Sequence, residues 1–187
     1  MSVTRGKRPS PPGISAPDDV ESMIRVDHAG EYGAVRIYEG QLAVLRHRAS
    51  ARKTVTAIRK MAQQEQVHLK AFDLLLNERR VRPTALGPLW HVAGFALGAA
   101  TALMGEKAAM ACTAAVEEVI DDHYASQIAR IENDDELKGR IETFRADEIA
   151  HRDEALARGA EETPGYRLLS SAIKAGCRLA IKLSERI

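Results

Sequence analysis

Two short segments, one in each half of the chain, each place a carboxylate and an imidazole three residues apart. They are "EQVH", residues 65–68, and "EIAH", residues 148–151. On a helix, residues three apart lie on the same face, so each segment would present its glutamate and histidine together. Carboxylates and imidazoles are both ligands of transition metals. A Glu-x-x-His unit that occurs twice therefore predicts a metal site formed by two helices.

The glutamates of both units lie on apolar faces of their predicted helices. Glu65 shares its face with apolar residues four and seven positions away on either side: Ile58, Met61, Leu69 and Phe72. Glu148 shares its face with Ile141, Phe144 and Ala155. A carboxylate buried without a compensating charge is costly, and a bound cation would compensate it.

Two further glutamates are predicted to face the core. Glu31 lies on the same stripe as Ile24, Val35 and Tyr38. In "AAVEEVIDDHY", Glu117 aligns with Met110, Ile120, Tyr124 and Ile128, whereas Glu118 aligns with Asp121 and Asp122. We therefore expect Glu117 to face inward as a carboxylate that bridges two ions, and Glu118 to face solvent.

The order of these residues divides the chain into two similar helical hairpins, since 34 positions separate Glu31 from Glu65 and 31 separate Glu117 from Glu148. One glutamate from each of two helices and Glu-x-x-His from the other two is the ligand set of ferritin-like di-metal bundles. Four carboxylates and two imidazoles suit iron or manganese with open positions for dioxygen better than four-coordinate zinc. The predicted ligands are Glu31, Glu65, His68, Glu117, Glu148 and His151.

Two other polar residues leave alternatives open. His28, three positions before Glu31, is a competing ligand. Asp147 either holds a ligand histidine through its second ring nitrogen or is an exposed acid.

Helical periodicity extends over most of the chain. We expect helices over about 18–48, 50–77 and 136–158 and a last helix over 167–187. The helical periodicity of the apolar stretch 85–105 continues into the residues that follow it. This pattern predicts either one long helix or two abutting helices. The prediction is an all-α, ferritin-like four-helix bundle of two hairpins with additional apolar and C-terminal helices. Residues 1–18 are predicted to be a flexible leader, and 19–187 one domain.

The apolar stretch 85–105 approaches the roughly 20 residues that a membrane-spanning helix needs. Gly94 and Gly98 form a GxxxG pair suited to close helix contact. Gly87 and Pro88 lie early in the stretch and its flanks show no charge asymmetry, which argues against a span. We expect a helix packed within the protein or lying at a membrane interface.

Net charge and cysteine content indicate which kinds of partner and which cysteine chemistry to expect. A net charge of +1 argues against nucleic acid as the main partner. Cys112 and Cys177 lie far apart in apolar surroundings without a secretory leader, so we expect buried free thiols.

Three segments resemble the demethoxyubiquinone hydroxylases of ubiquinone biosynthesis: "DHAGEYGAVRIYEGQLAVL", "PLWHVAGFALGAATALMGEKAAMACTAAVEE" and "AGCRLAIKLSER". The resemblance covers nearly everything after residue 20. It implies two iron ions (Fe2+/Fe3+) held by the six predicted ligands, and a role in electron or proton delivery for His123 and Tyr124 of "DDHY". The implied reaction is dioxygen-dependent hydroxylation of a ring carbon of a polyprenylated demethoxyubiquinone or demethoxyubiquinol.

The resemblance also implies partners and a location. The electron donor stays open between NADH, a reductase and the quinol substrate, and the chain has no GxGxxG nucleotide motif. A homo-oligomeric partner and an accessory lipid-binding protein also stay open. We expect a peripheral protein on a membrane lipid surface, at the cytoplasmic face of a bacterial inner membrane, with the mitochondrial inner membrane as the alternative.

Two other functions compete with the hydroxylase. A ferritin-like iron-oxidising or iron-storage protein would use the same ligands but would bind many irons per chain and would not need the apolar stretch. A helical membrane or scaffold protein would use the carboxylates structurally, so metal removal would leave its partner binding intact.

Overall fold

The computed structural model describes residues 20–187, so the predicted leader over 1–18 lies outside the described residues. Within this part of the chain all regular structure is helical, as predicted. Two short 3-10 turns, η1 (Ala49–Ala51) and η2 (Ala160–Glu162), accompany six helices. The helices are α1 (Val20–Leu45), α2 (Arg52–Arg79), α3 (Gly87–Met104), α4 (Glu106–Ile128), α5 (Asp135–Ala157) and α6 (Tyr166–Ser184).

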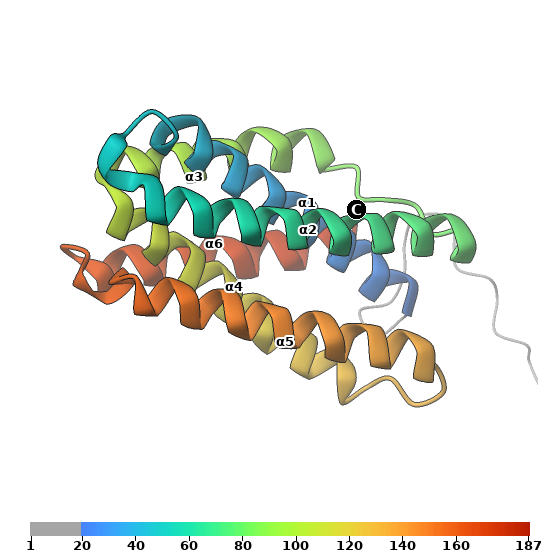
Figure 1. Ribbon diagram of the computed structural model, residues 1–187. Coiled ribbons are helices and arrows are strands. Elements are labelled where there is room, and N and C mark those ends of the chain that lie inside the picture. The colour runs from blue at the N-terminus through green and yellow to red at the C-terminus, as the bar shows by residue number, and fades with distance from the viewer. Residues whose placement is uncertain (1–19) are drawn as a thin grey trace, which may run out of the picture.

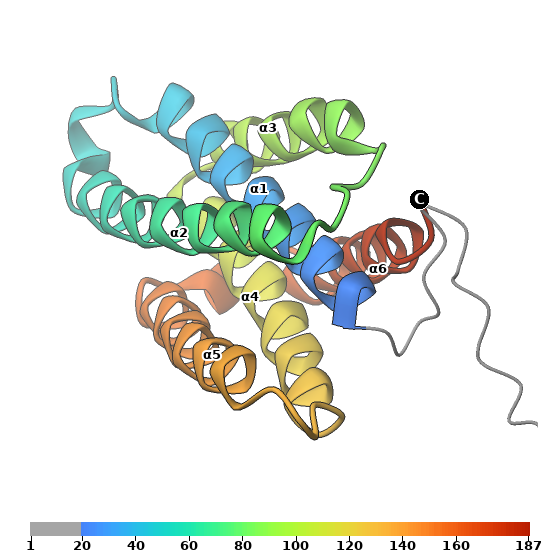
Figure 2. The ribbon, with the colours of Figure 1, turned by 90° about the vertical axis from the view of Figure 1, so that its right-hand side faces the viewer.

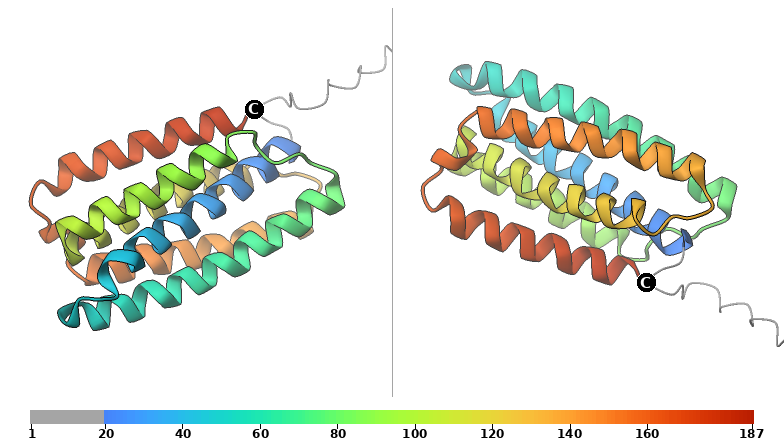
Figure 3. Two further views of the ribbon diagram at one scale, coloured as in Figure 1. Left: turned by 90° about the horizontal axis from the view of Figure 1, so that it is seen from above. Right: turned by 90° about the horizontal axis from the view of Figure 1, so that it is seen from below.

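The six helices of residues 20–187 are arranged in three layers of two helices each. Figure 2 views the bundle close to its long axis, with α1 and α4 in the middle, α2 and α5 on one side, and α3 and α6 on the other. Helices α1 and α2 form one hairpin and α4 and α5 the second (Figure 1). Seen from above and below, α3 and α6 extend alongside the two hairpins (Figure 3). The predicted bundle of two hairpins with an apolar and a C-terminal helix added is confirmed.

Gly105 divides the apolar region into two helices. Its φ of 127° lies in a region that glycine adopts without the steric penalty that a side chain would bring, so the chain turns there between α3 and α4. Pro88 occupies the first turn of α3, where its missing N–H costs no helical hydrogen bond. Of the two alternatives left by the sequence, the abutting helices are therefore the observed one.

Helix α3 packs on α1 through glycines that bring the two backbones into contact. A Cβ at Gly98 would lie 1.9 Å from the Ile37 carbonyl oxygen, and one at Gly94 would lie 2.9 Å from that of Gly33. From the α1 side, a Cβ at Gly40 would lie 2.2 Å from the Phe95 carbonyl oxygen. The predicted role of the GxxxG pair in close helix contact is confirmed. Of the described helices, α3 is also the one long and apolar enough to cross a membrane by length and composition.

The apolar core includes one cluster at each end of the hairpins. One cluster includes Leu45, Ile58 and Met110, and the other includes Ile24, Phe72 and Ile141. Along α1, α2, α4 and α5, the predicted ligand residues fall between the positions that these two clusters occupy. Apolar packing on both sides thus holds the polar residues in place.

Candidate metal centre and adjoining cavity

The structure brings the six predicted ligands together in the interior of the two hairpins. Each has at most 3% of its surface exposed. Their ligand atoms form two groups, in each of which the atoms lie within 4.8 Å of one another. The first group contains Glu31, Glu65, His68 and Glu148, and the second contains Glu65, Glu117, Glu148 and His151.

Membership of the two groups favours carboxylates other than Glu117 for the bridging role. Glu65 and Glu148 belong to both groups, whereas Glu117 belongs to the second alone. Each Glu-x-x-His unit therefore supplies a shared carboxylate, and Glu31 and Glu117 stand at opposite ends. The periodicity showed that Glu117 faces inward, but it could not show which carboxylate lies between two positions, because that depends on how the helices are staggered.

Eight buried polar atoms of the cluster lack hydrogen-bond partners. For Glu65 and Glu148 this applies to both carboxylate oxygens. It also applies to Oε2 of Glu31 and Glu117 and to Nδ1 of His68 and His151. Buried polar atoms are nearly always paired, so a set of unpaired polar atoms that face one another is what a site for bound cations would present. The donor set and its unpaired atoms fit two divalent cations.

Both histidines point Nδ1 into the cluster. His68 Nδ1 lies 3.2 Å from Glu148 Oε1, and His151 Nδ1 lies 2.9 Å from Glu65 Oε1. Neither contact is aligned as a hydrogen bond, so the atoms converge on the same space rather than satisfy each other. Each histidine thus faces the shared glutamate of the other hairpin.

The second nitrogens of the two histidines bind the residues that precede the shared glutamates. His68 Nε2 lies 3.1 Å from Asp147 Oδ2, and His151 Nε2 lies 3.2 Å from Gln64 Oε1. Gln64 Nε2 in turn donates to Asp147 Oδ1 at 3.2 Å. The first of the two alternatives for Asp147, a partner of a ligand histidine, is therefore observed. Contacts of this kind fix the orientation of imidazole ligands.

A tyrosine from the opposite hairpin donates a hydrogen bond to each terminal glutamate. Tyr38 Oη donates to Glu117 Oε1 at 2.6 Å, and Tyr124 Oη donates to Glu31 Oε1. Tyr124 therefore faces the cluster as predicted, but Tyr38 and Gln64 were not predicted as site residues. The internal repeat could have indicated Tyr38 as a site residue, because Tyr38 follows Glu31 by the same seven positions by which Tyr124 follows Glu117.

Burial and mutual repulsion set the protonation of the carboxylates. Burial, followed by contact with Glu148, raises the pKa of Glu117 well above its usual value, and burial likewise raises that of Glu31. Burial would also raise the pKa of Glu65, but its contacts with His151 and His68 outweigh that effect and bring the pKa to about 2. Glu65 is thus held as the anion in the centre of the cluster.

The carboxylates around the two histidines raise the pKa of both imidazoles. Burial alone would lower the pKa of His151, but its contacts with Glu148 and Glu65 raise it to about 9. The pKa of His68 is also raised, because its contacts with Glu148 and Glu31 outweigh burial. Both imidazoles are therefore doubly protonated and positively charged at neutral pH. A cation that binds Nδ1 must displace the proton on that atom.

His123 and His28 lie outside both ligand groups. His123 Nε2 lies 3.3 Å from Asp27 Oδ1 and 2.9 Å from Gln127 Nε2, and Gln127 also donates to Asp27 at 2.7 Å. His123 thus extends a buried polar network beside Tyr124 rather than touching the ligands. His28 Nε2 pairs with Asp73 Oδ1 at 3.0 Å, so it does not compete for the site.

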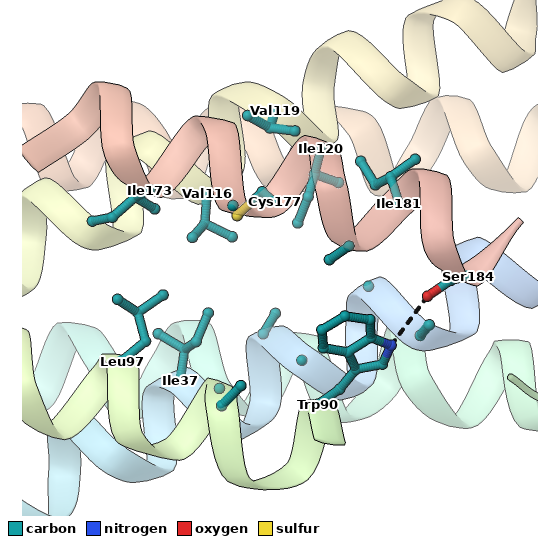
Figure 4. A pocket seen from close by; sticks show the side chains of 18 of the residues that line it. Ile37, Trp90, Leu97, Val116, Val119, Ile120, Ile173, Cys177, Ile181 and Ser184 are labelled. Carbon is teal, nitrogen blue, oxygen red and sulfur yellow. Dashed lines mark hydrogen bonds between the residues drawn. The ribbon is translucent and has the colours of Figure 1, made fainter. Parts of the chain in front are cut away.

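An apolar cavity of about 550 Å³ lies on the other side of α1 and α4. Its lining comes from α1, α3, α4 and α6, whereas the ligand groups come from α1, α2, α4 and α5. Figure 4 shows side chains that line it, with the Trp90 indole donating to Ser184 Oγ at 3.1 Å across one end. Gly30 and Val116, which line the cavity, directly precede Glu31 and Glu117 in the chain. Only α1 and α4 separate the cavity from the ligand cluster.

The two cysteines are free thiols, as predicted. Cys112 is buried, whereas Cys177 is half-buried and lines the cavity. Burial raises the pKa of both thiols, that of Cys112 to about 12 and that of Cys177 to about 11. Both are therefore neutral at physiological pH.

Comparison with known proteins places the chain in one family. Residues 18–184 match the family described as ubiquinone biosynthesis protein COQ7. The chain belongs to this family. It is 56% identical over 180 residues to the 3-demethoxyubiquinol 3-hydroxylase of Rhodospirillum rubrum, which covers 96% of this chain and 81% of the relative.

Mitochondrial members of the COQ7 family are also similar. The human protein named NADPH-dependent 3-demethoxyubiquinone 3-hydroxylase, mitochondrial, is 53% identical over 174 residues, covering 90% of this chain and 78% of the relative. The Saccharomyces cerevisiae protein named 5-demethoxyubiquinone hydroxylase, mitochondrial, is 41% identical over 184 residues, with 90% and 78% covered. The resemblance predicted from the sequence is therefore confirmed.

Proposed function

We propose that this COQ7-family chain is a di-iron monooxygenase that hydroxylates the ring of a polyprenylated demethoxyubiquinone or demethoxyubiquinol, with dioxygen as the oxygen source. The observation that carries the proposal is the position of a large apolar cavity directly behind the ligand cluster, with α1 and α4 shared by both. The names of the bacterial, human and yeast relatives support the substrate class.

The ligand cluster fits two iron ions by charge and by donor type. We assign Glu31, Glu65, His68 and Glu148 to one ion and Glu65, Glu117, Glu148 and His151 to the other. Carboxylate-rich sites with two imidazoles and open positions are typical of oxygen-activating iron. When bound, the iron pair would supply the activation of dioxygen, which the side chains of the cluster do not provide by themselves.

The cavity suits the quinone because its wall is almost entirely apolar. An isoprenoid chain would replace water next to side chains such as Leu97, Ile120 and Ile173, which is favourable at about 25 cal/mol per Å². The ring would have to lie against α1 and α4, because those two helices carry Glu31 and Glu117. The fold thus separates a polar reaction centre from an apolar binding site by two helices.

Tyr124 is the residue that we assign to proton transfer beside the iron site. Burial, followed by the charge of Glu31, raises the pKa of its phenol well above the usual value, so Tyr124 keeps its proton at neutral pH. That proton already points at Glu31. His123, whose side chain is 14% exposed, would connect this region to solvent through Asp27 and Gln127.

Reaction with a demethoxyquinone, ferrous iron, dioxygen and a reductant tests the proposal. We expect a product that carries one new ring hydroxyl, identified by mass spectrometry and by its loss of one ring proton signal. Iron oxidised without a change in the quinone, together with many irons bound per chain, would instead favour the iron-storage function.

We further propose that the protein binds a membrane surface through the α3–α6 face. This face exposes large apolar side chains on both sides of the cavity: Leu89, Val92, Leu103 and Met104 on α3, and Leu168 and Leu179 on α6. Large apolar patches on a protein surface mark sites of protein or membrane contact. A quinone with a long tail could then pass from lipid into the cavity without crossing water.

Vesicle flotation tests the membrane face. The double variant Val92→Glu/Leu179→Glu should lose most of its binding to phospholipid vesicles, because burying a carboxylate in the interface is costly. Val67→Glu is the matched control, since Val67 is 63% exposed but lies on α2, across the bundle from α3 and α6. Equal loss of binding in both variants would contradict this orientation.

A further inference from the structure

The glycines around the α1–α3 contact fall into two kinds. At Gly40, Gly94 and Gly98, a Cβ would run into the backbone of the facing helix, so close packing explains them. At Gly30 and Gly33, a Cβ would meet nothing within 4 Å. Both of these glycines lie inside α1 and line the cavity.

Neither backbone conformation nor packing accounts for Gly30 and Gly33. The described glycines with positive φ are Gly105, Gly159 and Gly165, so Gly30 and Gly33 have ordinary helical backbone. A glycine in the interior of a helix makes the helix less stable than alanine does, because it loses more conformational freedom on folding. The fold alone would therefore favour alanine at both positions.

The position of the two glycines beside the cavity explains why glycine rather than alanine occurs there. Gly30 directly precedes Glu31, and Gly33 follows Glu31 by two residues, so both lie where the cavity borders the helix that carries this ligand. A substituted benzoquinone ring is wider than the isoprenoid chain attached to it. The ring must also occupy the part of the cavity beside the ligand cluster, because that is where it reacts.

We propose that Gly30 and Gly33 are specificity-determining residues that leave room for the substituted quinone ring beside the iron site. The inference rests on the proposed function. A methyl group at either position would project into the space of the ring, while the helix itself would gain stability. The two glycines thus make the helix less stable but allow a wider ligand to bind.

Binding to the metal-free protein tests this without any turnover. Trp90 is the one tryptophan of the chain and lines the cavity, so a bound quinone should quench its fluorescence. The probe is a demethoxyquinone with a short isoprenoid tail. For Gly30→Ala and Gly33→Ala we expect Kd to rise about tenfold, because forcing a methylene-sized group into a filled site has an effect of this order. The unfolding temperature should stay level or rise.

Two other glycines provide controls. Gly139→Ala on α5 is matched, since a Cβ there meets nothing within 4 Å and Gly139 does not line the cavity. It should match the stability gain and leave Kd unchanged. Gly176→Ala adds a methyl group to the same cavity from α6, which carries no ligand, and should raise Kd less than the α1 variants do.

The outcomes separate this inference from the proposed function. An unchanged Kd in Gly30→Ala and Gly33→Ala, with normal quenching in the unaltered protein, would overturn the inference alone. An equal rise in Gly176→Ala would overturn the assignment of the ring to the α1 side. Absence of quenching in the unaltered protein would show that the quinone does not bind in the cavity. It would overturn the proposed binding site together with the inference.

Discussion

Glu117→Ala is expected to lower hydroxylation at least about 100-fold, whereas Glu118→Ala should keep most of the activity. Loss of a partner that only orients a ligand typically costs 10- to 100-fold, and loss of a ligand should cost at least as much. Glu117 is buried and belongs to one ligand group. Glu118 is its chain neighbour, but its side chain is 43% exposed and pairs with Lys174 at 2.6 Å.

Iron content and stability accompany this comparison. Because Glu117 belongs to one group alone, Glu117→Ala should keep about one iron per chain, while Glu118→Ala should keep two. The metal-free Glu117→Ala protein should unfold at no lower temperature than the parent, since burial already disfavours the charge of Glu117. Similar activity losses in the two variants would contradict the assignment of their helical faces.

Tyr124→Phe is expected to keep both irons but to slow turnover about 100-fold, the lower end of the contribution that a positioned proton donor makes. The phenol is not part of either ligand group, but it donates to Glu31. Tyr38→Phe is the matched control, because it removes the equivalent hydrogen bond to Glu117 from the other hairpin. It should affect turnover much less.

The solvent deuterium isotope effect on turnover distinguishes proton transfer from positioning. It should change in Tyr124→Phe and not in Tyr38→Phe. His123→Ala should give a smaller loss than Tyr124→Phe, since His123 lies outside both groups and contacts Asp27 and Gln127. Equal losses in the two tyrosine variants, with an unchanged isotope effect, would leave Tyr124 a positioning residue only.

Much of the ligand cluster was predictable because helical periodicity places residues on faces. A glutamate such as Glu65, four positions from Met61 on an apolar stripe, must point inward wherever the helix packs. Tyr38 lies on the same kind of stripe but was not predicted as a site residue, because a tyrosine among apolar residues is typical of a core. Its role depends on Glu117 of another helix, and a single helix pattern holds no information about that contact.

The arrangement of α3 and α6 could be predicted only in part. The glycine pair Gly94 and Gly98 indicated a close contact, but not that α1 would be the partner. The cavity was not predicted, since it is defined by empty space between four helices rather than by any one residue type. Gly30 and Gly33 carried the local signal, because they are glycines inside a helix that continues unbroken through them.

Turnover with isotopically labelled dioxygen tests the central claim most directly. The protein would be loaded anaerobically with ferrous iron, then exposed to labelled dioxygen with a demethoxyquinone and a reductant, and the product would be analysed by mass spectrometry. The account predicts one labelled oxygen atom in the ring hydroxyl of the product. Incorporation of oxygen from water, or oxidation of iron with the quinone unchanged, would contradict it.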